Sequence, residues 1–244
     1  MQWQHLMAAP MPRLHSLLTA ALGACLAATP LAGLAQEPTT AGSATPDVNA
    51  KGFYATLGAG ASWPQNLNGS TSVFGVDVTG NYSLNGGFAL ETGLGYDFGA
   101  VRGELTYVYN NASLNTLTVS ALGSTGTASI TNGNVNTNSA MASAYVDIPT
   151  GSRWVPYVGG GLGYTNIGWG AFSARANNVT VGFNSGNQGV LGYQGKVGVT
   201  YLASKTTDLF VEGVYQGSTG FTVDSVNYDP LSSWGARIGA RYRF

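Results

Sequence analysis

The sequence predicts an all-β fold, an eight-stranded antiparallel transmembrane β-barrel built as an up-and-down meander. Three observations predict it. The chain ends in a strand of strict polar and apolar alternation, seven earlier segments repeat that period, and the connections between the segments are alternately short and long. Charged residues make up only 9% of the chain, against about 25% in ordinary soluble domains. A surface this poor in charge is typical of a protein that meets lipid.

The closing strand shows the alternation most clearly. Trp234, Tyr242 and Phe244 share one face with smaller apolar residues, whereas Arg237 and Gly239 lie on the opposite face with two further arginines. A period of two residues is the period of a strand. An apolar face opposite a charged face is what lipid outside and a polar, packed interior require.

This closing segment resembles that of the small outer-membrane β-barrels, the opacity-type and OmpA-type family of eight-stranded transmembrane barrels. The motifs that carry the resemblance lie at 52–54, 156–159 and 241–244. The resemblance covers residues 52–244 and implies short periplasmic turns, long extracellular loops and a place in the outer membrane of a Gram-negative bacterium. It also implies a C-terminal assembly signal that the barrel-insertion machinery reads, formed by Arg237, Gly239, Tyr242 and Phe244.

Seven further segments each have about the length that a tilted strand needs to cross the hydrocarbon layer. They lie at 53–61, 88–98, 101–109, 140–148, 158–164, 193–201 and 209–215. The short connections are 99–100, 149–153 and 203–206, and the long ones are 63–87, 110–138, 165–189 and 217–232. Alternation persists within three of the long connections, at 74–78, 117–121 and 179–183. We expect these pieces to extend the hairpins above the membrane.

The distribution of charge predicts which face points inward, because a soluble barrel would show the same alternation with the faces swapped. All eleven charges of the predicted strands fall on one face: Glu91, Asp97, Arg102, Glu104, Asp147, Lys196, Asp208, Glu212, Arg237, Arg241 and Arg243. An eight-stranded barrel is just wide enough for side chains. Charges of both signs among Gly and Ser fit such an interior, and large rings near strand ends suit an aromatic girdle. Met141, Tyr145, Phe210 and Val214 share the inward face and are expected to pack among the charges.

An interior charge network is expected from seven of these residues, because a buried charge without a partner is costly. Its members are Glu91, Arg102, Glu104, Lys196, Glu212, Arg237 and Arg241. Glu104 and Glu212 could in principle form a catalytic carboxylate pair. The favoured interpretation is that they neutralise the basic side chains of the barrel core.

The N-terminal residues 1–35 have the layout of a cleaved export signal. Arg13 and His15 precede an apolar run at 17–28 that is too short to span a bilayer as a helix, and cleavage is expected before Gln36. Residues 36–51 are expected to form a flexible periplasmic lead-in. Met11 is an alternative start, and Cys25 is an alternative lipidation site, although the residues after it stay apolar.

No catalytic, cofactor-binding or metal-binding residue is predicted. Both histidines, His5 and His15, fall in the predicted signal, and the chain has no Gly-x-Ser-x-Gly elbow. The glycine run at 159–163 superficially resembles a phosphate loop but lies in a strand pattern without a following helix. Asp224 and Asp229 share a loop, which is a weak calcium signal.

The sequence therefore predicts a non-catalytic, monomeric outer-membrane barrel with a role in envelope integrity or in surface interaction such as adhesion. A narrow porin-like channel for small solutes and a lipid-modifying outer-membrane enzyme are the alternatives. The expected partners are outer-membrane lipid and lipopolysaccharide, the barrel-assembly machinery during insertion, and a host-surface ligand bound through the loops. A net charge of −1 gives no reason to expect nucleic acid.

Overall fold

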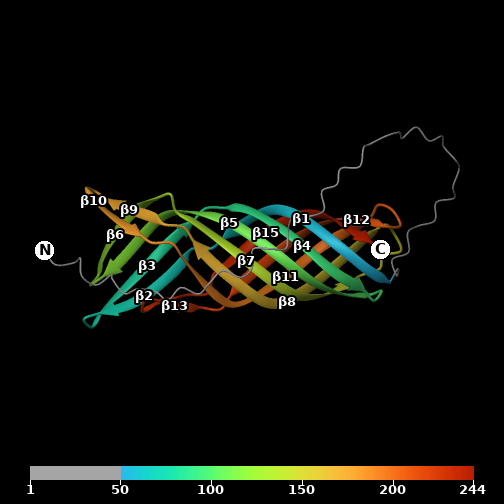
Figure 1. The fold of residues 1–244 in the computed structure, drawn as a ribbon, viewed down its shortest axis with the longest axis horizontal. Coiled ribbons are helices and arrows are strands. Elements are labelled where there is room, and N and C mark those ends of the chain that lie inside the picture. The colour runs from blue at the N-terminus through green and yellow to red at the C-terminus, as the bar shows by residue number, and fades with distance from the viewer. Residues whose placement is uncertain (1–50) are drawn as a thin grey trace, which may run out of the picture. The chain divides into compact units, whose positions relative to one another are not determined.

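The computed structural model describes residues 51–244, in which all regular structure is β (Figure 1). Residues 1–50, which hold the predicted export signal (1–35) and nearly all of the predicted lead-in (36–51), lie outside the described residues. In the described range, no helix has the length and hydropathy needed to cross a membrane.

Eight strands close into a ring, in which each strand pairs antiparallel with the next and the last returns to the first. They are β1 (Gly52–Pro64), β4 (Gly87–Asp97), β5 (Val101–Ala121), β7 (Asn134–Asp147), β8 (Trp154–Trp169), β11 (Gly186–Leu202), β12 (Thr207–Ser218) and β15 (Ser232–Arg243). Closure satisfies the backbone groups that an open sheet would leave at its edges. The predicted fold class is confirmed.

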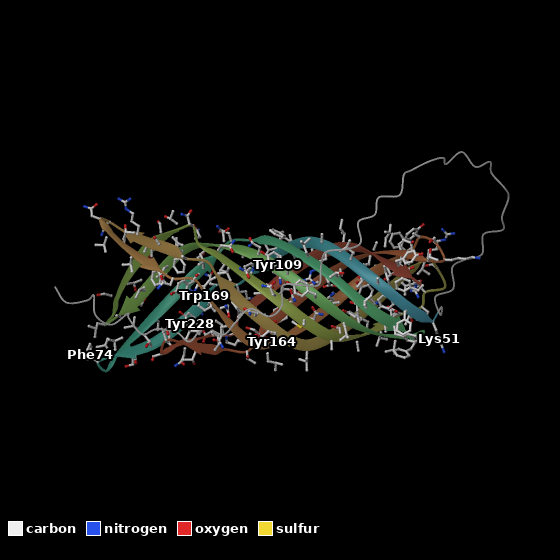
Figure 2. The ribbon with its side chains drawn as sticks, viewed as in Figure 1. Lys51, Phe74, Tyr109, Tyr164, Trp169 and Tyr228 are labelled. Atoms are coloured by element: carbon white, nitrogen blue, oxygen red, sulfur yellow. The ribbon has the colours of Figure 1, made fainter. Side chains whose placement is uncertain are left out.

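The outward face of the ring carries an apolar belt. Five of its most exposed aliphatic side chains, each more than three-fifths exposed, are Leu57, Leu94, Leu105, Leu162 and Ile238. Aromatic rings flank this belt at both ends, as expected for a girdle at the headgroups. Near the short turns lie Phe53, Tyr96, Phe98, Trp154, Tyr201, Tyr242 and Phe244; near the long connections lie Trp63, Phe88, Tyr107, Tyr109, Tyr164, Tyr193, Tyr215 and Trp234. We call the second set the upper girdle; Tyr109 and Tyr164 of this set are labelled in Figure 2.

The long connections are mostly strand, and they build a second sheet beyond the upper girdle, which we call the rim (Figure 1). Besides the distal half of β5, the rim contains β2 (Leu67–Val73), β3 (Val76–Leu84), β6 (Ser124–Thr131), β9 (Phe172–Ala176), β10 (Val179–Phe183), β13 (Phe221–Val223) and β14 (Val226–Tyr228). Its strand order is β13-β14-β2-β3-β5-β6-β9-β10. The predicted extension of the hairpins is confirmed, except that Phe74 lies in the turn between β2 and β3 and not within a strand.

The polarity of the sheet reverses between the barrel and the rim. In the rim, together with the adjoining ends of β7, β8 and β11, the inward side chains form an apolar core around Leu114, Val135, Ile167, Phe172 and Val190. Partly buried residues pack against it, namely Tyr82, Leu84, Ile130, Trp169, Phe183, Phe221 and Leu231. A bulge helps to set this arrangement: the pairing between β3 and β5 skips Asn115, so Leu114 and Leu117 are both buried.

Candidate functional site in the bore and the rim

The interior of the membrane-spanning ring, called the bore below, begins at its periplasmic end with a buried arginine. Arg102 is 1% exposed and binds Asp147 in a bidentate manner, with Nε donating to Oδ2 at 2.6 Å and Nη2 to Oδ1 at 3.0 Å. Its guanidinium lies over the rings of Tyr145 and Tyr157, 4.9 and 5.1 Å from their centroids. Tyr54, which is fully buried, accepts from Nη1 at 3.4 Å. A buried arginine is stable where a carboxylate accepts two hydrogen bonds from its planar guanidinium and aromatic rings stack against it.

A second ion cluster at the same end ties the last strand, β15, to β4 and β12. Arg243 donates to Asp97 Oδ2 at 2.7 Å and to Asp208 Oδ2 at 2.8 Å. Arg241 lies 3.5 Å from the same Asp208 oxygen, and its guanidinium covers the ring of Tyr54 at 5.0 Å. The strand that closes the ring is therefore held by charge as well as by its backbone.

The centre of the bore holds a chain of four charges. Lys196 Nζ lies 2.5 Å from Glu91 Oε1 and 3.1 Å from Glu212 Oε1. Arg237 binds the other oxygen of Glu91. The hydroxyl of Tyr157 donates to Glu212 Oε2 at 2.6 Å, which satisfies the carboxylate on its second side. Lys196, Glu91, Glu212 and Arg237 come from β11, β4, β12 and β15, so this chain of charges spans the bore.

Of the seven residues predicted to form one network, the structure brings these four together and places Arg102 and Arg241 in the two clusters at the periplasmic end. The expectation that Glu104 neutralises basic side chains stays a prediction: Lys196, Arg241 and Arg102 act on its carboxylate through space and not by direct contact. Glu104 is buried, yet within the described residues it forms no ion pair or hydrogen bond. Its register partners are Gly95 and Ser143, which carry no charge. Pairing of Glu104 with Glu212 as a catalytic couple is unsupported, since Glu212 is engaged by Lys196 and Tyr157.

Sequence reasoning also missed two tyrosines of the bore. Tyr54 and Tyr157 lie on the inward face with 0% and 2% exposure, next to the arginines and Glu212. The alternation that places Phe53 and Val158 outward also places their neighbours Tyr54 and Tyr157 inward, so this pattern could have identified both tyrosines. Among the four apolar inward residues that were predicted, Tyr145 and Phe210 join Tyr157 in one cluster, and all four are buried.

Above the charges, the bore ends in amides and hydroxyls. Asn110 Nδ2 donates to Thr137 Oγ1 at 3.0 Å and to Gln216 Oε1 at 3.1 Å, and Arg237 Nη2 donates to the same Gln216 oxygen at 2.8 Å. A cavity of about 50 Å³ lies at this level, with Ile167 and Val135 of the rim core on its upper side. The cavity has room for ordered water among these polar groups. Side chains therefore fill the interior from the periplasmic end to the rim core.

The predicted C-terminal assembly residues have structural contacts of their own. Arg237 belongs to the central charges, and a Cβ added at Gly239 would lie 2.3 Å from both Leu57 O and the Phe210 ring. Tyr242 and Phe244 point outward, with their ring centroids 5.6 Å apart in an edge-on arrangement. Recognition of these residues by the insertion machinery stays a prediction.

The described residues contain no group of three or more His, Cys, Asp or Glu side chains that could hold a metal ion. The glycine run at 159–163 lies inside β8, where a Cβ at Gly159 would meet the Tyr145 ring at 2.2 Å. Asp229 accepts a hydrogen bond from Asn68 Nδ2 at 3.3 Å, whereas Asp224 lies in the β13–β14 turn.

The tips of two rim hairpins carry bulky apolar residues in an unusual backbone conformation. Phe74 is 95% exposed with a φ of 50°, and Leu122 is 83% exposed with a φ of 51°; each precedes a glycine that also has positive φ. Two-residue turns with both central residues in this region favour Asn, Asp or Gly at the first position. A bulky side chain there is unfavourable. Figure 2 shows Phe74 at the far end of the rim.

One pair of tyrosines stabilises the base of the rim. The rings of Tyr82 and Tyr228 lie 6.4 Å apart, and Tyr228 stacks on Phe221 at 5.1 Å. Burial raises the pKa of both phenols above the ordinary tyrosine value, and the contact between the two hydroxyls raises that of Tyr82 further. Both phenols therefore stay neutral in the folded rim at any ordinary pH.

The closed ring, the apolar belt and the aromatic girdles define a small outer-membrane β-barrel with eight membrane-spanning strands. Within this class the chain belongs to the surface antigen family, whose pattern matches residues 58–235. No curated protein sequence matches the chain.

Solved structures are similar in fold. The chain is similar to the outer membrane protease OmpT from Escherichia coli, with 8% identity and a TM-score of 0.52, over 82% of this chain and 98% of that one. It is also similar to Neisserial surface protein A, with 19% identity and a TM-score of 0.48, over 79% of this chain and 97% of that one. OprG from Pseudomonas aeruginosa matches with 16% identity and a TM-score of 0.49, over 81% and 98%. At such identities the similarity to the protease concerns the fold alone.

Proposed function

We propose that this surface antigen is a non-catalytic outer-membrane protein, whose filled barrel anchors a β-sheet rim for contact with another surface. The observation that carries the proposal is the pair of apolar tips. Phe74 and Leu122 are held outside the protein at a conformational cost, in turns where Asn or Gly would be free of it. Strain of this kind is typical of positions that serve binding and not folding.

The bore supports a structural role for the barrel. Salt bridges, tyrosines and the rim core occupy its length. This disfavours the porin-like alternative. For the enzyme alternative, the carboxylates of the bore are engaged by basic groups, except for Glu104, which has no potential catalytic partner within hydrogen-bonding distance.

Attachment of cells that display the full-length protein tests the contact role. Escherichia coli expressing it is compared with empty-vector cells on an epithelial monolayer, using the variants F74N/L122N and S225N. Ser225 is a polar tip residue of the β13–β14 hairpin, also with positive φ, so its substitution is a matched control. We expect the double variant to attach about fivefold less than the wild type, and S225N to attach like the wild type. Equal attachment of the double variant and the wild type would overturn the role of the tips.

Outer-membrane fractionation and planar-bilayer recording test the remaining parts of the proposal. We expect the protein in the outer-membrane fraction as a heat-modifiable band on detergent gels, freed of residues 1–35. We expect no discrete conductance from the refolded barrel. Reproducible single-channel steps would favour the porin-like alternative.

A further inference from the structure

The outward face of the rim is built almost entirely from hydroxyl and amide side chains. The strand register aligns six of them in one row across six neighbouring strands: Thr222, Asn227, Ser70, Thr79, Ser120 and Thr125. A second row, one step closer to the membrane, contains Asn68, Asn81, Thr118 and Thr127. We call these ten residues the hydroxyl-amide face.

This face is exceptional for a surface that meets water. Each of its residues is exposed or half-exposed, and none is charged. The exposed surfaces of small soluble domains contain about 25–35% Lys, Arg, Glu and Asp, with both signs interspersed. Charged neighbours on the same side of the sheet are Asp77 near the β2–β3 turn, Asp229 beside Asn68 and Arg175 on β9. Polar groups without charge are what a neutral, hydroxyl-rich ligand would match.

The centre of the face is hollowed and partly preorganised. A hollow of about 240 Å³ is lined by Asn68, Ser70, Thr79, Asn81 and Thr118, together with Ser120, Asp229 and two glycines. Asn81 Nδ2 donates to Asn68 Oδ1 at 2.6 Å, and Asn68 Nδ2 donates to Asp229 Oδ2 at 3.3 Å, so both amides are held in place. The hydroxyls of Ser70 and Thr79 have no side-chain hydrogen bond among the described residues and are free to bind a ligand.

The height of the face above the membrane identifies its surroundings. Tyr109 of the upper girdle and Thr118 lie nine residues apart on β5, which is about 30 Å of strand. A strand tilt of about 40° reduces this to roughly 20 Å above the headgroups. The outward side of the rim continues the side of the barrel that meets lipid, so it points laterally into the layer of sugars carried by neighbouring outer-leaflet glycolipids. Phosphate groups close to the lipid would require basic residues, which the hydroxyl-amide face lacks.

We propose that the hydroxyl-amide face binds the neutral sugars of the glycolipids that surround the barrel in the outer leaflet. The hydroxyls and amides of the two rows exchange hydrogen bonds with sugar hydroxyls, and the hollow around Asn81 and Thr79 takes one sugar ring. This inference rests on the outer-membrane location in the proposed function but not on contact through the tips.

The test uses the full barrel refolded in lipid nanodiscs and two deacylated saccharides from lipopolysaccharide. One retains the neutral hexoses of the core, and the other is truncated to the acidic residues next to lipid A. Binding is measured by titration calorimetry. We expect the complete saccharide to bind and the truncated one to bind at least about tenfold more weakly. Equal binding of both, or no binding of the complete saccharide, would overturn the proposal.

Two double variants test whether the saccharide binds at the hydroxyl-amide face. T79V/T118V removes two hydroxyls from the face and keeps the shape and strand propensity of each side chain. T92V/T206V is the matched control, with Thr92 on the lipid face of β4 and Thr206 in a periplasmic turn. We expect about tenfold weaker binding for the first variant and an unchanged affinity for the control, since two hydrogen bonds of typical strength account for about a factor of ten.

Further measurements separate sugar binding by this face from misfolding and from contact through the tips. Both double variants must keep the heat-modifiable band, which shows that the barrel is folded. F74N/L122N must bind the saccharide normally, so a failure of the adhesion role leaves this result intact. Unchanged binding by T79V/T118V, or tighter binding of sulfated or sialylated host-type glycans than of the neutral core, would contradict a face for neutral outer-leaflet sugars.

Discussion

The bore and the rim bury opposite kinds of side chain on the inward face of one continuous strand layer. In the bore the inward residues are charged and the outward ones apolar, whereas in the rim the inward residues are apolar and the outward ones are hydroxyls and amides. Strand β5 takes part in both, with Arg102 inside near its start and Leu117 inside near its end. The reversal shows that one continuous strand folds against two solvents, lipid below the upper girdle and water above it.

The two regions must also be stabilised differently. Burial of apolar side chains stabilises the rim because water surrounds it. In the bore the outward apolar face already meets lipid, and the ion pairs mainly offset the cost of placing charge in a low-dielectric interior. A bore residue is therefore expected to matter most when its removal leaves a partner unpaired.

The largest effect is expected from removing a central cation. Lys196→Met keeps the side-chain stem but leaves Glu91 and Glu212 without their shared ammonium group. We expect the free energy of unfolding to fall by about 3–5 kcal/mol, the usual cost of an uncompensated buried charge. Urea titration of the refolded barrel in detergent measures it.

The matched control for this variant is Lys205→Met, in an exposed periplasmic turn. We expect it to change stability by less than about 0.5 kcal/mol. A Lys196→Met barrel as stable as this control would show that the central charges are not coupled.

The rim core is expected to respond to cavities. Ile167→Ala removes a side chain that is 2% exposed in the rim core, and we expect a loss of about 2–4 kcal/mol. Leu162→Ala on the same strand is the comparison, because Leu162 is 62% exposed on the lipid face and its truncation leaves no cavity. Equal losses for the two variants, measured by urea unfolding, would mean that the rim has no packed core of its own.

Membrane-imposed alternation explains why the eight barrel strands and their lipid faces were predictable from sequence. In a bilayer most outward residues must be apolar, so residues such as Leu57, Leu94 and Leu162 make the alternation visible along each strand. The rim strands were only partly visible, because their outward Ser, Thr and Asn residues are equally typical of loops. The alternating apolar residues Leu117 and Val119 were the part of the sequence that indicated a strand there.

The pairing of charges could not be predicted in the same way. Alternation predicts that Glu104 points inward, but its neighbours across the bore depend on the stagger and tilt of the strands, which sequence does not state. The tyrosines were missed for a different reason. A crowded interior argues against large rings, yet Tyr54 and Tyr157 fit because glycines face them: a Cβ at Gly95 would lie 2.3 Å from the Tyr54 ring and one at Gly198 2.7 Å from the Tyr157 ring.

A glycine of the closing strand offers a smaller effect and separates packing from assembly. Gly239→Ala would place a methyl group 2.3 Å from the Phe210 ring, and we expect about 1–3 kcal/mol of destabilisation in purified, refolded protein. Phe210→Leu should partly rescue this loss by making room for the methyl group. If the single variant is fully stable in vitro but fails to insert in cells, the glycine acts as part of the assembly signal.

The smallest effect concerns pH. Burial raises the pKa of Tyr82 and Tyr228, so the folded rim favours the neutral phenols more than the unfolded chain does. Their contribution to stability is complete below the ordinary tyrosine pKa of about 10 and is lost as the pH rises above it. Tyrosinate absorbance should place Tyr82 and Tyr228 among the residues that titrate late, and Tyr82→Phe should remove one of these late residues. Titration of both at the ordinary pKa would contradict burial at the base of the rim.

Nitroxide labelling of one strand tests the reversal of polarity most directly. Leu105 and Thr118 both point outward on β5, at the lipid belt and on the rim respectively. Single cysteines at these positions are labelled in protein reconstituted in bilayers, and relaxation by oxygen is compared with relaxation by a water-soluble nickel complex. We expect the label at 105 to respond to oxygen and the label at 118 to respond to nickel. Two labels that respond alike would contradict a strand that passes from lipid into water.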